Sequence, residues 1–111
     1  GVPRLLRDGR VRRSWLGLGG QNVPLDRRAV RKNTLPVQSG VLVQHVEPKS
    51  PADAAGVLEG DIVIALGEAP VCGIDDLHRV LGEEHVGVPT TLTVLRGFDP
   101  TRLSVTPREA K

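Results

Sequence analysis

One fifteen-residue segment, residues 50–64, constrains the fold more than any other part of this 111-residue chain. It reads SPADAAGVLEGDIVI. The serine can cap a short helix, the proline after it has the φ angle of a first helical residue, and Gly56 can adopt the left-handed conformation that ends a helix. Gly60 and Asp61 predict a turn, and the apolar residues 62–66 predict a strand inside a sheet. The segment therefore predicts a helix, a turn and a buried strand in immediate succession.

The composition indicates one small domain with an aliphatic core. Hydrophobic residues make up 39% of the chain, which is enough for a single core. Trp15 and Phe98 are its two aromatic residues, and this scarcity disfavours a nucleic-acid site built on stacked bases. Cys72 is the single cysteine, and no Cys/His cluster has zinc spacing, so we expect neither a metal nor a cofactor. No apolar run reaches the length of about 18 residues that a membrane span needs, and no signal peptide is visible.

The charge is distributed unevenly along the chain. Residues 1–32 contain nine Lys or Arg and two acids, whereas residues 33–111 contain six Lys or Arg and eleven acids. A basic end of this kind could attract nucleic acid, an anionic surface or acidic peptides. Solvated positions on a linker explain the same charges more simply. We therefore expect no nucleic-acid partner, and an anionic-surface or nucleic-acid binder acting through the basic N-terminal third is kept as an alternative.

Short patterns predict the remaining elements. Apolar and β-branched runs bounded by Gly or Pro predict strands, and Gly or Pro clusters predict turns. The expected strands cover residues 18–23, 40–46, 62–66, 91–95 and 103–106, with a short return strand that begins at Val71 after a turn over 67–70. Short helical segments are expected over residues 2–8 and 26–32, and the tail from Pro107 is expected to fray. This order predicts an α+β fold, a small partly open β-barrel or sandwich of five to six strands capped by two helices.

Residues 74–84 have the spacing of an amphipathic helix. Leu77 and Val80 share one stripe of that helix, and we expect them to face the core. The adjacent stripe, which can line a groove, holds Ile74, His78 and Leu81.

The segment at 50–64 resembles the S-P-A-x-x-A-G-Φ-x-x-G-D-x-I signature of PDZ domains, especially those attached to bacterial trypsin-like serine proteases of the HtrA/Deg family. Residues 15–19, Trp-Leu-Gly-Leu-Gly, are similar to the carboxylate-binding loop of the same domains, x-Φ-G-Φ. The loop comes first, and the 74–84 helix and a terminal hairpin follow, so the resemblance covers roughly residues 10–106. It implies a PDZ-like fold that binds C-terminal or extended hydrophobic segments of partner or unfolded proteins by β-strand addition.

The glycine loop suits a terminal carboxylate. Such a group needs several backbone N–H donors converging on one point, and glycine lets successive amides turn inward. The resemblance implies that Leu16 and Leu18 line a pocket for the last side chain of a peptide, while the strand at 18–23 offers its free edge. The expected peptide-binding residues are Leu16, Gly17, Leu18, Gly19, Gly20, Ile74, His78 and Leu81.

Two flanking positions bear on selectivity. Ile74 stands where one PDZ subgroup has a histidine that binds a Ser or Thr hydroxyl, so hydrophobic ligand residues are favoured there. Arg12 and Arg13 precede the glycine loop and can attract the terminal carboxylate, although solvated linker charges explain them equally well.

The opening residues 2–18 resemble the helix and exit strand that lead from an HtrA-type catalytic domain into its first PDZ domain. The resemblance implies a linker from a missing N-terminal protease domain over residues 1–13, a PDZ domain over 14–107 and a tail over 108–111. It also implies that the domain presents substrates to, or regulates, an attached trypsin-like serine endopeptidase. That parent is expected to be homo-oligomeric and to lie in the periplasm or cell envelope. The alternative hypothesis is that the domain belongs to a different PDZ-bearing protease or to a scaffold protein.

No catalytic residue is expected in the chain itself. A Ser-His-Asp arrangement needs an exposed serine beside oxyanion donors, and no G-x-S-x-G or G-N-S-G-G segment is present. Ser50 near His45 and Asp53 is better explained as a helix cap with solvated neighbours. Cys72 is expected to be a small hydrophobic residue at a strand end.

Overall fold

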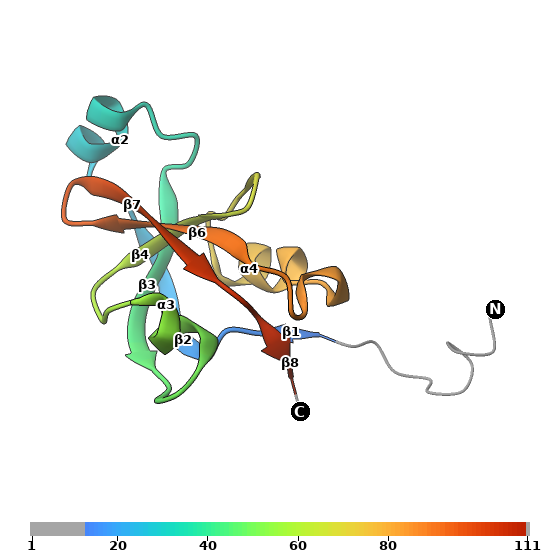
Figure 1. The fold of residues 1–111 in the computed structure, drawn as a ribbon. Coiled ribbons are helices and arrows are strands. Elements are labelled where there is room, and N and C mark those ends of the chain that lie inside the picture. Colours follow the sequence, from blue (N-terminus) through green and yellow to red (C-terminus); the bar gives the residue numbers. More distant parts are fainter. Residues whose placement is uncertain (1–12, 111) are drawn as a thin grey trace.

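The computed structural model describes residues 13–110. Strands β2, β3, β4, β6 and β7 form one antiparallel sheet in that order, β5 pairs with β4, and β1 pairs with β8 in a separate two-stranded sheet (Figure 1). The predicted α+β fold with an open sheet is confirmed. The elements are β1 (Ser14–Trp15), β2 (Leu18–Pro24), α2 (Arg27–Asn33), β3 (Ser39–Val46), α3 (Pro51–Ala55), β4 (Ile62–Leu66), β5 (Ala69–Pro70), α4 (Ile74–Val80), the 3-10 helix η1 (Glu83–His85), β6 (Thr90–Arg96), β7 (Asp99–Val105) and β8 (Arg108–Glu109).

The segment that constrains the fold most has the predicted structure. The Ser50 hydroxyl accepts a hydrogen bond of 3.1 Å from the amide of Asp53 at the start of α3. Gly56 ends the helix with φ of 91°, as expected of a left-handed cap. Asp61 does more than form a turn, because Arg96 donates two hydrogen bonds to its carboxylate, at 2.9 and 2.7 Å. The turn is thereby fixed to β6.

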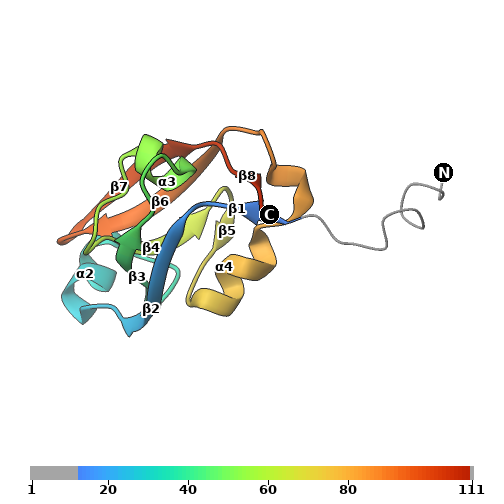
Figure 2. The ribbon, with the colours of Figure 1, turned by 90° about the horizontal axis from the view of Figure 1, so that it is seen from below.

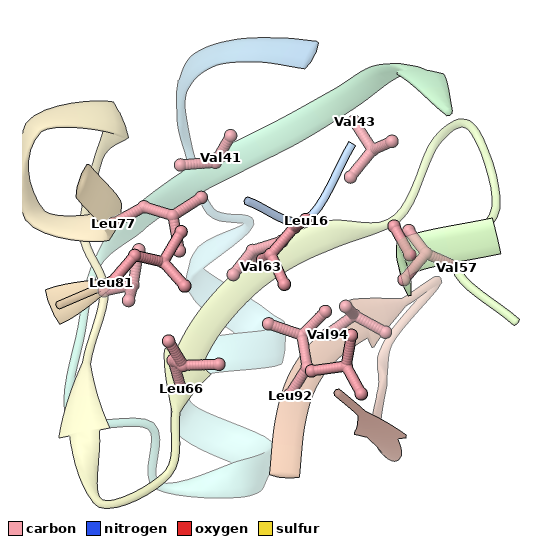
Figure 3. Close-up of a cluster of buried hydrophobic side chains, with 13 residues drawn as sticks. Leu16, Val41, Val43, Val57, Val63, Leu66, Leu77, Leu81, Leu92 and Val94 are labelled. Carbon is pink, nitrogen blue, oxygen red and sulfur yellow. The ribbon is translucent and has the colours of Figure 1, made fainter. Parts of the chain in front are cut away.

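The sheet buries both of its faces. The main cluster lies on the face covered by α3 and α4, and Figure 3 shows its side chains converging from strands and helix. A smaller cluster lies on the other face, where α2 covers it, and consists of Leu25, Ala29, Val37, Ile64 and Leu95. Neighbouring residues Val63 and Ile64 of β4 belong to different clusters. The 21–39 region, which contributes Leu25, Ala29 and Val37, therefore covers the second face.

Two hairpin turns are shorter than the sequence predicts. β5 begins at Ala69, so the prediction of a return strand starting at Val71 is wrong. β7 likewise begins at Asp99, four residues before the expected Leu103. Each turn has two residues and begins with a glycine of positive φ, 59° at Gly67 and 67° at Gly97. Two-residue hairpins favour positive φ, so pairing starts directly after the turn.

The helix predicted over 74–84 ends earlier. α4 stops at Val80, and residues 83–85 form the separate helix η1. Gly82 between them has extended backbone angles, φ of −88° and ψ of 174°, which no helical residue adopts. The glycine therefore splits the predicted helix into two.

The tail does not fray as expected. Arg108 pairs with Trp15, and the amide of Ala110 donates to the carbonyl of Arg13 at 2.8 Å. The helix predicted over 2–8 and the side chain of Arg12 lie outside the described residues, and the division of the chain at 13 and 107 stays a prediction. Within residues 13–110, no helix has both the length and the apolar character needed to cross a bilayer.

Candidate functional site

The candidate site is built on an edge strand. β2 is the first strand of the sheet order and pairs with β3 on one side; α4 lies along its other side (Figure 2). An edge strand presents a row of N–H and C=O groups that another chain can pair with. The strand predicted over 18–23 is thus present, extends to Pro24, and has the expected free edge.

The loop that leads into β2 requires glycine at position 17. Its φ is 84°, in the left-handed region. A Cβ added there would lie 2.2 Å from the Cβ of Ser50, the capping residue of α3. The glycine loop and the 50–64 segment, predicted separately, therefore pack directly against each other.

Two carbonyls of this loop are held from the α3 side. The amide of Ala52 donates to Leu16 O at 2.8 Å, and the amide of Glu47 donates to Gly17 O at 2.7 Å. The peptide bonds are trans, so the N–H of each peptide unit points opposite to its C=O. The N–H groups of Gly17 and Leu18 therefore point together, away from α3. This pair of donors is the geometry that a carboxylate needs.

The hydrogen bond from the Glu47 amide to Gly17 O also determines which residues of β2 face the free edge. Because Gly17 O accepts from the amide of Glu47, the residue directly after β3, the backbone of Leu18 is turned to the opposite side. Alternation along the strand turns Gly20 and Asn22 the same way. The register shift beside Gly20 leaves Gln44 of β3 unpaired, so the alternation along β2 is preserved. Gly20 must also be glycine, since a Cβ would lie 2.2 Å from the carbonyl oxygen of Leu42.

The apolar residues predicted for the site lie at different depths. Leu16 is 3% exposed and Leu81 8% exposed, so both belong to the main core (Figure 3). Leu18 and Ile74 are partly buried and pack against that core, whereas His78 is exposed. Together they form the β2–α4 surface, in which Leu18 and Ile74 are the accessible apolar side chains and Leu16 and Leu81 lie beneath.

The helical stripes differ from the expected ones at the end of α4. Leu77 is buried as predicted, but Val80 is half-buried and Leu81 is the more enclosed of the two. Leu81 follows the last helical residue and has φ of −78° and ψ of 73°. Its side chain therefore leaves the helical stripe and turns into the core.

Two polar residues that the sequence analysis missed, one in β1 and one in β2, anchor the two ends of α4. Ser14 Oγ donates to the carbonyl of Gly82 at 2.5 Å, just beyond the end of the helix. At its start, the amide of Ile74 donates to Asn22 Oδ1 at 2.7 Å. The N-cap position is Gly73, which has no side chain to cap the helix. The sequence signal for this contact is weak: Gly73 leaves the helix start without a local side-chain cap, but nothing in the sequence points to Asn22 as the partner.

Cys72 is exposed rather than packed, contrary to expectation. Its thiol donates to Asp76 Oδ2 at 2.8 Å, and Arg79 donates to Asp76 Oδ1 at 2.6 Å. These hydrogen bonds hold the pKa of Asp76 well below its usual range. The same carboxylate raises the pKa of the Cys72 thiol, chiefly because it accepts a hydrogen bond that only the protonated thiol can donate, and also because it disfavours a second negative charge. The thiol is therefore a weak nucleophile.

Basic side chains gather on α2. Arg28 forms an ion pair of 3.1 Å with Asp26, and its guanidinium lies 5.3 Å from the ring centre of Phe98. Lys32 lies 3.9 Å from a carboxylate oxygen of Asp99. Two of the four cations of this helix are thus partly balanced by acids; the four are Arg27, Arg28, Arg31 and Lys32.

Comparison with known proteins gives one consistent answer. The sequence model of the PDZ domain family matches residues 17–106. The serine endoprotease DegS of Escherichia coli strain K12 is 30% identical over 109 residues, 97% of this chain and 30% of that protein. A probable periplasmic serine endoprotease, DegP-like, of Rhizobium meliloti strain 1021 is 34% identical over 95 residues, 86% of this chain and 18% of that protein.

A solved structure of similar size is also related. The crystal structure of the HtrA3 PDZ domain bound to a phage-derived ligand (FGRWV) has a TM-score of 0.64 and 26% identity. The similarity covers 89% of this chain and 88% of that one. By contrast, the chain spans about 30% of the length of the first curated relatives it matches.

Proposed function

The chain belongs to the PDZ domain family and is similar to the PDZ domains of HtrA-type serine proteases, and from this we propose that it binds C-terminal or extended hydrophobic segments of other proteins by adding them as a strand to β2. The observation that carries the proposal is the loop before β2, where the N–H groups of Gly17 and Leu18 point together at the beginning of a free edge. A C-terminal carboxylate would accept from these two donors, and the preceding residues would pair with β2.

The side chains around the loop favour an apolar last residue. Leu18 and Ile74 offer partly exposed apolar surface, and Leu16 and Leu81 support it from the core. Ile74 offers no hydrogen-bonding side chain to a ligand hydroxyl, so selectivity for hydrophobic residues follows. His78 is exposed one turn along α4 and would contact a ligand from the side.

The role in the parent protein is part of the same proposal. The relatives are serine endoproteases, and this chain is a PDZ domain rather than their catalytic domain. We propose that the parent is a homo-oligomeric trypsin-like protease of the periplasm or cell envelope. For the location, the support is that the Rhizobium relative is described as a probable periplasmic serine endoprotease. The domain would present substrates to the protease domain or regulate it.

The test is a titration of residues 1–111 with FGRWV, the peptide of the HtrA3 structure, in two forms, with a free carboxylate and with a C-terminal amide. Micromolar affinity, about −8 kcal/mol, is expected for the free acid. Amide NMR shifts should cluster on residues 16–23 and 74–81 and weaken strongly on amidation. Shifts of equal size with both forms would indicate recognition of internal segments, and no shifts in either region would contradict the site.

Leu18→Glu tests the position of the site. A carboxylate at Leu18 would place negative charge beside the ligand carboxylate and remove apolar contact, so binding should be lost while the fold is retained. Leu58→Glu is the matched control, because Leu58 is 54% exposed in the turn before β4. Unchanged affinity in Leu18→Glu, measured by the same titration, would rule out this surface.

A further inference from the structure

The side chain of Asn22 crosses from β2 to the start of α4. Its Oδ1 accepts a hydrogen bond of 2.7 Å from the amide of Ile74. A Cβ added to Gly73 would lie 3.0 Å from this oxygen and 3.2 Å from Asn22 Cγ, so the amide group packs closely against the backbone that leads into the helix. The space between strand and helix is therefore filled at this point.

The backbone on the helix side of this contact is fixed as well. Ser39 Oγ, at the start of β3, donates to the carbonyl of Cys72 at 2.7 Å. The amide of Cys72 in turn donates to Asp76 Oδ2 in the first turn of α4, at 3.1 Å. Residues 72–74 are thus tied to two strands and to their own helix, and they are not free to move away from β2.

The hydrogen bond between Asn22 Oδ1 and the Ile74 amide, which we call the bridge, has a defined place along the free edge of β2. Leu18, Gly20 and Asn22 are the residues whose backbone groups face this edge. A strand rises about 3.3 Å per residue, so Asn22 lies about 13 Å from Leu18. A peptide paired antiparallel to β2 with its carboxylate at the glycine loop would bring its fifth residue from the end to Asn22.

We propose that the hydrogen bond between Asn22 and Ile74 closes the far end of the peptide site, so that β2 pairs with about four C-terminal residues and residues further upstream add no affinity. This inference rests on the proposed function. Asn22 is then a residue that determines ligand length. A longer ligand would have to displace the cap of α4, whose own N-cap position, Gly73, has no side chain to replace it.

The experiment measures affinity as a function of peptide length by isothermal titration calorimetry. The probes are GRWV, AGRWV and AAAGRWV with free carboxylates, which share the last four residues of the HtrA3 ligand. Added alanines contribute main-chain pairing and little else. For the wild-type chain, the three dissociation constants should agree within about twofold, since the bridge excludes the extra pairing.

Two substitutions complete the test. Asn22→Ala removes the bridge, and AAAGRWV should then bind about fivefold more tightly than GRWV, the gain from about one additional hydrogen bond. Asn22→Asp keeps an oxygen acceptor for the Ile74 amide, so its dissociation constants for the three peptides should remain nearly equal. Thermal unfolding checks that both variants are folded. If Asn22→Ala is unfolded, Asn22→Ser replaces it, because a serine side chain is too short to reach the Ile74 amide.

The outcomes separate the two proposals. Affinity that rises with length in the wild-type chain would overturn the bridge as a length limit and leave the proposed function intact. Equal affinities of Asn22→Ala for the short and the long peptides would also overturn the bridge as a length limit. Failure of every peptide to bind any variant would overturn the proposed function and this inference with it.

Discussion

At the scale of single residues, Asp61 is 2% exposed and yet paired with a cation. Burial on its own raises the pKa of this aspartate, but the hydrogen bonds from Arg96 and from the amide of Leu58 outweigh it and hold the pKa of Asp61 below its ordinary value. A carboxylate whose pKa is lower in the folded state stabilises the fold above its unfolded pKa of about 3.9. That stability is lost as the pH falls through the folded pKa.

Arg96→Met should lower the free energy of unfolding by about 3 kcal/mol at neutral pH, because it leaves Asp61 buried without its cation. The pKa of Asp61 should then lie above its unfolded value, so the difference from wild type should shrink on acidification towards pH 4. Urea unfolding, followed by the fluorescence of Trp15, the single tryptophan, measures the loss of unfolding free energy and its dependence on pH. Arg102→Met, at an exposed position of β7, is the control, and an equal loss in both variants would contradict the role of the pair.

Cys72 gives a second prediction at this scale. Since the thiolate is the reactive form and Asp76 raises the pKa of the thiol, iodoacetamide at pH 8 should alkylate Cys72 more slowly than a cysteine in an unstructured peptide. Asp76→Asn should accelerate the reaction severalfold. Asp75→Asn makes the same change of charge one residue away, where the side chain is exposed, and should have little effect. Equal acceleration by both substitutions would assign the effect to overall charge.

At the scale of elements, the sequence predicts what local chemistry determines. α3 and β4 follow from a capping serine, a glycine C-cap and an apolar run, all within one segment. The glycine loop is predicted from its resemblance to the carboxylate-binding loop of PDZ domains. Contacts between distant residues are not visible in this way. The partner of Asn22 lies 52 positions away and that of Ser14 lies 68 positions away, so the two anchors of α4 were missed. The same reason explains the missed β8, whose partner is β1 at the other end of the described chain.

Helix α2 covers the second face of the sheet, and the contribution of this packing to the stability of the fold can be measured. Leu25 is buried in the cluster beneath α2, so Leu25→Ala should destabilise the fold by about 3 kcal/mol through lost burial and a residual cavity. Leu58→Ala makes the same change at an exposed position and should cost little. Thermal unfolding compares the two. Because the cluster lies on the sheet face opposite α4, the affinity of folded Leu25→Ala for FGRWV should equal that of wild type; a changed affinity would show that α2 contributes to the site.

At the scale of the whole molecule, the two ends of the described chain meet beside the candidate site (Figure 1). Trp15 pairs with Arg108, whose guanidinium lies 5.2 Å from the indole ring centre and donates to the carbonyl of Lys49 at 2.9 Å. β1 continues directly into Leu16 and Gly17 of the glycine loop. The strand pair that joins the termini therefore also fixes the chain just before the proposed carboxylate donors.

Removal of residues 108–111 should consequently affect stability and binding together. The fold should lose about 2 kcal/mol, from the hydrogen bonds of β8 and the contact of Arg108 with Trp15. Peptide affinity should fall as well, because Trp15 and the loop after it lose their partner strand. Urea unfolding and titration with FGRWV measure the two effects. Arg108→Ala in the full chain is the control: it keeps the β8 backbone, so it should remove part of the stability and leave the affinity nearly unchanged. If the truncated chain binds the peptide as tightly as wild type, β1 and β8 stabilise the fold without shaping the site.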